Sequence, residues 1–69
     1  MKKPLNYSIT WNENGEQKEI LIFTHKDMIK KYIDMLGNYN ISLLTVWKVY
    51  NQGKEDYTGK LNSFIEYGK

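Results

Sequence analysis

Residues Thr24–Gly37 read THKDMIKKYIDMLG and contain the start, body and end signals of an amphipathic helix. Thr24 can accept a hydrogen bond from a first-turn N–H, and Asp27 follows at the spacing of a capping box. Gly37 is placed to close the helix in the left-handed conformation. Apolar side chains recur at helical spacing on one side, and the lysines and aspartates fall on the other. The apolar side consists of Met28, Ile29, Tyr32, Ile33, Met35 and Leu36. We expect it to pack on the strands that flank the helix.

A β-hairpin is predicted before the helix. Leu5–Trp11 alternates apolar and polar residues, Asn14-Gly15 is a strong signal for a type I′ turn, and Gln17–Phe23 supplies the second strand. A two-residue turn pairs Ile9 with Ile20, Tyr7 with Ile22 and Trp11 with Lys18. Leu21 and Phe23 then lie on the other side of the sheet. Either a longer turn or a bulge shifts this facing, or the two side chains form a surface for a partner or for self-association.

The chain after the helix predicts two further strands and an ambiguous tail. Ile41–Tyr50 is the longest β-prone run and has apolar residues on both faces, which suits an interior strand or an edge covered by a partner. After a turn at 51–54, residues 55–58 can form a short strand. For residues 58–67 helix and strand both stay open, and we favour one or two helical turns because Leu61, Phe64 and Ile65 follow helical spacing.

These elements predict a single small α+β domain over residues 1–69. The helix returns the chain so that the third strand lies beside the first in a right-handed crossover. The expected architecture has two layers, with a ββαβ(β) antiparallel sheet of three or four strands in the order 2-1-3-4. The helix Thr24–Gly37 covers one face of this sheet, and a short C-terminal helix follows.

Composition argues against several classes of function. All ten basic residues are lysines and the net charge is +2. The absence of arginine argues against sequence-specific DNA recognition, and the mild positive charge argues against a DNA mimic. No apolar run approaches the roughly 20 residues of a membrane span. The N-terminus has no apolar signal core, so we expect a cytoplasmic protein that does not contact membranes.

No catalytic or metal-binding pattern emerges, and we expect neither enzymatic activity nor a cofactor. His25 is the single histidine, no cysteine is present, and the carboxylates follow no ligand spacing. We interpret His25 as a surface or boundary residue, with a general base as the alternative.

The leading hypothesis is a non-catalytic accessory protein that binds another macromolecule, and its partner is expected to be a protein. Tyrosine and tryptophan are abundant, and two strands have apolar residues on both sides. A homodimer through the same surface is a variant of this hypothesis. The abundance of residues with AT-rich codons suggests a phage or another mobile element that encodes a modulator of a host protein. The predicted contact residues are Leu21, Phe23, Leu44, Val46 and Tyr50.

The alternative hypothesis is a weak, sequence-tolerant binder of single-stranded nucleic acid. An aromatic platform near Trp11 and Tyr7 would stack bases, and lysines of the helix would contact phosphates. The competing interpretation is that the tryptophans fill the core and the lysines form a solvated helix face. The residues predicted for this alternative are Trp47, Lys48, Tyr50, Lys26, Lys30 and Lys31.

Overall fold

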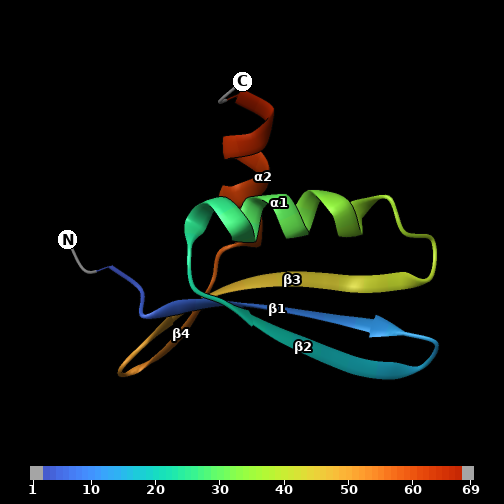
Figure 1. Ribbon diagram of the computed structural model, residues 1–69, viewed down its shortest axis with the longest axis horizontal. Helices are drawn as coiled ribbons and strands as arrows, with labels where there is room; N and C mark the ends of the chain where they lie inside the picture. The colour runs from blue at the N-terminus through green and yellow to red at the C-terminus, as the bar shows by residue number, and fades with distance from the viewer. Residues whose placement is uncertain (1–2, 68–69) are drawn as a thin grey trace.

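The computed structural model describes residues 3–67 and has an α+β fold with both helices on one side of an antiparallel sheet (Figure 1). The four strands lie in the order β2-β1-β3-β4, as predicted. The elements are β1 (Asn6–Glu13), β2 (Glu16–Ile22), α1 (His25–Leu36), β3 (Ile41–Tyr50), β4 (Gly53–Asp56) and α2 (Thr58–Tyr67).

The β1–β2 hairpin turns through two residues, Asn14 with φ 55° and Gly15 with φ 84°. Both values are positive, as a type I′ turn requires. The turn fixes the predicted register, in which Ile9 pairs with Ile20 and Trp11 with Lys18. A longer turn or a bulge in this hairpin is therefore ruled out as the reason for the facing of Leu21. Leu21 pairs with Ser8, on the side of the sheet away from the helices.

A β-bulge that the sequence did not predict lies between β1 and β3. The pairing shifts between Thr10, which faces Thr45, and Asn12, which faces Ser42. Leu43 lies in this interruption and has a φ of 54°. A bulge adds one residue to one strand and increases the local twist.

The start of α1 follows the prediction, whereas its end differs. The hydroxyl of Thr24 accepts a hydrogen bond from the backbone N–H of Asp27 at 3.1 Å. Gly37 has a φ of −86°, so the expected left-handed conformation is wrong. The N–H of Asn38 instead donates to the carbonyl of Met35 at 3.1 Å. This bond tightens the last turn and satisfies a carbonyl that the helix itself leaves unpaired.

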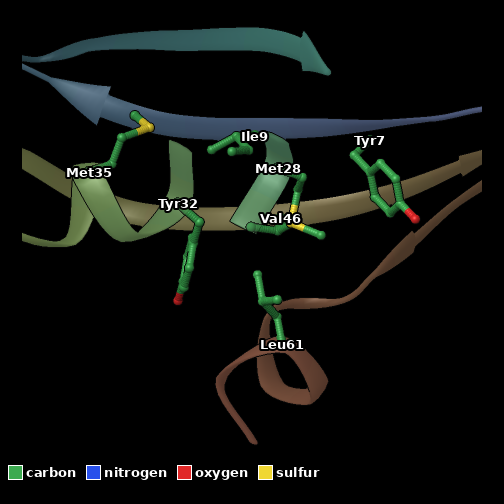
Figure 2. Close-up of a cluster of buried hydrophobic side chains, with 7 residues drawn as sticks. All are labelled: Tyr7, Ile9, Met28, Tyr32, Met35, Val46 and Leu61. Carbon is green, nitrogen blue, oxygen red and sulfur yellow. The ribbon is translucent and has the colours of Figure 1, made fainter. Parts of the chain in front are cut away.

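The hydrophobic core lies between the sheet and the helices (Figure 2). Ile9 and Val46 come from the two central strands, while Met28, Tyr32 and Met35 come from α1. Leu61 of α2 points into the same cluster and is fully buried. Tyr7 completes the set of seven buried side chains. With so few core residues, each one accounts for a large share of the stability.

The C-terminal helix is longer than predicted and spans ten residues. Its first backbone N–H, from Thr58, donates to a carboxylate oxygen of Asp56 at 2.9 Å. The hydroxyl of Thr58 therefore does not cap the helix but bonds the backbone of Val46. None of the helices within residues 3–67 is long and apolar enough to cross a membrane.

The Asp56 cap predicts an acid-dependent loss of stability. The backbone hydrogen bond from Thr58, followed by its side-chain hydrogen bond, holds the pKa of the Asp56 carboxyl below its usual range. A lowered pKa in the folded state stabilises the fold above the unfolded-state pKa, and this contribution is lost as the pH falls through the folded-state pKa. The difference in unfolding free energy between wild type and Asp56→Asn should shrink below a pH of about 4. Urea denaturation over a pH series measures it, and a difference independent of pH would contradict the assignment.

Candidate interaction surface

The face of the sheet opposite the helices is uncovered by any described element, and we call it the open face. On β1 it presents Ser8 and Thr10, because the alternating residues Tyr7 and Ile9 point into the core. On β3 it presents Thr45, Trp47 and Val49, because Val46 points into the core. On β2 it presents Glu19 and Leu21, which pair with Thr10 and Ser8.

A nearly apolar row crosses the centre of the open face. Ser8 pairs with Leu21 on one side and with Trp47 on the other. Ser8 is only 1% exposed although no helix covers it, so its neighbours' side chains must shield it. Its hydroxyl donates to Glu19 at 2.6 Å. The small Ser8 thus forms the floor between two large apolar side chains.

Trp47 is held in place by its polar group. The indole N–H donates to the hydroxyl of Thr10 at 3.1 Å, and the Lys54 ammonium lies 4.8 Å from the centre of the Trp47 ring. These contacts leave the indole half-buried in a fixed orientation. A rigid aromatic ring of this kind loses little conformational entropy when a partner binds.

A hollow of about 250 Å³ adjoins Trp47 and is lined by residues of β1, β2 and β3, among them Thr10, Leu43 and Thr45. Leu43 is 78% exposed. Leu43 therefore has its backbone in the left-handed region, and its large apolar side chain buries little of its surface.

The predicted partner-binding residues do not share one surface. Leu21 lies on the open face and Phe23, directly after β2, is 74% exposed. Val46 has to be removed from the set because it is fully buried beneath the helices. Leu44 is half-buried and packs against the core. Tyr50 falls on the same side of β3 as Val46, since residues of equal parity in a strand share a face.

The residues predicted for nucleic-acid binding are divided between two sides of the molecule. Trp47 lies on the open face, whereas Tyr7 and Trp11 lie on the helix side, where Tyr7 belongs to the core and Trp11 packs against it. The expected platform of Trp47 and Tyr50 with Trp11 and Tyr7 is therefore not formed, because Trp47 lies on the opposite side of the sheet from the other three rings. Lys48 lies over the ring of Tyr57, 4.1 Å from its centre. Lys26, Lys30 and Lys31 are exposed on α1, across the sheet from Trp47.

His25 belongs to an aromatic cluster that joins α1, β1 and α2. Its ring centre lies 5.7 Å from those of Tyr7 and Phe64, in edge-on contacts. Its Nε2 is 3.3 Å from the hydroxyl of Tyr57. Burial, and then the charges of Tyr57 and Tyr50, raise the pKa of the Tyr7 hydroxyl above its usual value. Through these contacts His25, at the start of α1, touches both β1 and α2.

The residues between 3 and 67 contain no group of three histidine, cysteine, aspartate or glutamate side chains that could hold a metal ion. Comparisons of this chain with family models, curated proteins and solved structures found no match. The proposals below therefore rest on the chain's own residues.

The sequence analysis did not name Leu43 as a contact residue and named Trp47 only for nucleic-acid binding, although a signal for a protein-binding surface was present. The signal was the alternation along β3, which groups together four odd-numbered residues, three of them large and apolar: Leu43, Thr45, Trp47 and Val49. Deciding which parity faced the helices required the β1–β3 register, in which Ile9 pairs with Val46.

Proposed function

We propose that this chain is a non-catalytic accessory protein that docks on another protein through the open face. The observation that carries the proposal is Leu43, which combines a φ of 54° with 78% exposure of its side chain. A left-handed conformation costs an ordinary residue about 1–2 kcal/mol. Because the Leu43 side chain is mostly exposed in the isolated chain, its burial does little to offset this cost. Backbone strain of this kind concentrates at functional sites.

The composition of the open face also favours a protein partner. It combines Trp47 and Leu21 with small hydroxyl residues, and its charges are mixed, with Glu19 and Lys54 both present. Buried aromatic anchors surrounded by weakly contributing neighbours are typical of protein interfaces. A nucleic acid has less support, because the lysines of α1 and the ring of Trp47 lie on different sides of the sheet.

We further propose that the partner is a cytoplasmic host protein and that the gene belongs to a phage or another mobile element. The supporting observations are the small size, the absence of cysteine and the abundance of residues with AT-rich codons. They are independent of the geometry of the open face.

Affinity capture with matched variants tests the docking surface. The bait carries Leu43→Gly or Trp47→Ala, and the control bait carries Leu36→Ala, which removes a side chain that is 56% exposed on α1. Leu43→Gly should leave the unfolding free energy unchanged or raise it by up to about 1 kcal/mol, because glycine tolerates positive φ. Loss of a captured protein from this bait therefore cannot be attributed to unfolding.

The expected result is a protein from a lysate of the encoding cells that is retained by wild type and Leu36→Ala and lost from both open-face variants. Equal retention by all four baits would contradict the choice of surface. Binding of labelled single-stranded DNA that weakens steeply with salt would instead favour the nucleic-acid alternative.

A further inference from the structure

Strand β2 is an edge of the sheet and pairs only with β1. An edge strand has a row of backbone N–H and C=O groups without partners, which another extended chain can pair with. This row of unpaired backbone groups on β2 is distinct from the side chains of the open face. The ligand that it matches is another extended chain.

The hydrogen bonds of β3 identify which residues of β2 have these outward groups. The N–H of Val46 donates to the Thr58 hydroxyl at 2.9 Å, and its carbonyl accepts from the N–H of Tyr57 at 2.8 Å. Val46 therefore does not bond its cross-strand neighbour Ile9, and Ile9 directs its backbone groups to Ile20 on β2. Bonded and non-bonded residues alternate along an antiparallel pair. Glu19 and Leu21, on either side of Ile20, thus direct their backbone groups away from the sheet.

The two edges of the sheet differ in their protection. The β4 edge is short and contains Lys54, Glu55 and Asp56 in succession, and charges on a short strand discourage pairing. The second half of β2, from Ile20 to Ile22, has no charge. Leu21 is 57% exposed, and Phe23 beyond the strand is 74% exposed. Of the two edge strands β2 and β4, it is β2 that combines open backbone groups with apolar side chains.

We propose that a second copy of this chain pairs with β2 in an antiparallel manner, with the two-fold axis at Leu21. With a two-fold axis normal to the sheet, odd-numbered residues of one copy meet odd-numbered residues of the other, and even-numbered residues meet even-numbered ones. The helices of both copies then lie on the same side of the joined sheet. The apolar segment 20–22 is symmetric about Leu21: Leu21 meets its own copy, and Ile20 meets Ile22 of the other chain. Leu21, the residue on this axis, is one of those whose backbone groups point away from the sheet.

Charge disfavours an axis at either of the two residues that precede Leu21. An axis at Glu19 places two glutamates directly opposite each other, which is destabilising. An axis at Ile20 places Lys18 opposite Ile22 and Glu19 opposite Leu21, so that charged residues face apolar ones on both sides of the sheet. With the axis at Leu21, Glu19 meets Phe23 and the apolar residues between them meet one another.

The dimer does not depend on the docking function proposed above. Pairing at β2 joins the two sheets into one and places the open faces of both copies side by side. A monomeric variant would keep its own Leu43 and Trp47, so failure of the dimer and failure of the docking surface give different results.

Molar mass by light scattering across a concentration series is the first test. The expected mass of wild type is twice the 8.2 kDa of one chain. Leu21→Lys places two lysines on the axis and should be monomeric at concentrations where wild type is dimeric. Leu36→Lys is the matched control, because Leu36 on α1 is 56% exposed against 57% for Leu21, and it should remain dimeric. A wild type that is monomeric at every concentration would overturn the proposal.

A single cysteine tests the register, since the chain has none of its own. Directly opposed residues of a bonded pair have Cα atoms about 5.5 Å apart, within the range of a disulfide. Leu21→Cys should form a covalent dimer on mild oxidation. Glu19→Cys should not, because its copies would lie about 13 Å or more apart along the strands. Equal cross-linking of both variants, or of neither, would contradict pairing at Leu21.

Discussion

The Leu61→Ala variant is expected to lose about 3 kcal/mol of unfolding free energy, because the truncation leaves a cavity in a fully buried site. Leu61 is the contribution of α2 to a core of seven side chains. A domain of this size has a stability of only a few kcal/mol. The midpoint of thermal unfolding should fall by roughly 10–25 °C, and much of the population should be unfolded at 37 °C.

Ser63→Ala on the same helix is the control, since Ser63 is exposed and the change leaves the core intact. Circular dichroism during thermal and urea denaturation measures both variants. If α2 were a detachable tail, Leu61→Ala would unfold with the midpoint of wild type. That outcome would separate α2 from the cooperative unit.

The Thr58→Val variant is expected to lose about 2 kcal/mol, although it keeps the shape of the side chain. The Thr58 hydroxyl accepts a hydrogen bond from the N–H of Val46 at 2.9 Å. Val46 is fully buried, so its N–H would have no water as a substitute partner. Leaving a buried donor unsatisfied costs about 1–3 kcal/mol.

Thr58→Ser keeps the hydroxyl and should lose less than about 1 kcal/mol, the contribution of one methyl group. Chemical denaturation compares the two variants, and amide hydrogen exchange at Val46 reports the bond directly. Faster exchange in Thr58→Val than in Thr58→Ser is expected. Equal stability of the two variants would show that the hydroxyl is not the partner of this N–H.

Local signals in the sequence were sufficient for α1, for the β1–β2 hairpin and for the order of the strands. Thr24 and the apolar spacing of Met28, Tyr32 and Met35 define α1, and Asn14-Gly15 defines the hairpin and its register. These predictions succeeded because caps and two-residue turns depend on residues that are neighbours in the chain. The strand order followed from the handedness of the crossover, which is a general property of such connections.

The candidate surface was harder to predict because it depends on contacts between distant residues. No turn connects β1 to β3, so nothing local specifies that Ile9 pairs with Val46. Leu44, Val46 and Tyr50 were expected on a partner-binding surface, yet this pairing directs that side of β3 toward the helices. Trp47 thereby came to the open face, and the bulge placed Leu43 beside it at the same hollow.

The sequence by itself determined the helix, the hairpin and the antiparallel sheet with α1 on one face, because each follows from short-range spacing and from the handedness of connections. Only the tertiary structure decided which side of β3 is buried, that Leu43 lies strained in a bulge, and that α2 completes the core through Leu61. These features arise where segments far apart in the chain compete for the same small core, and packing among them selects one register over another.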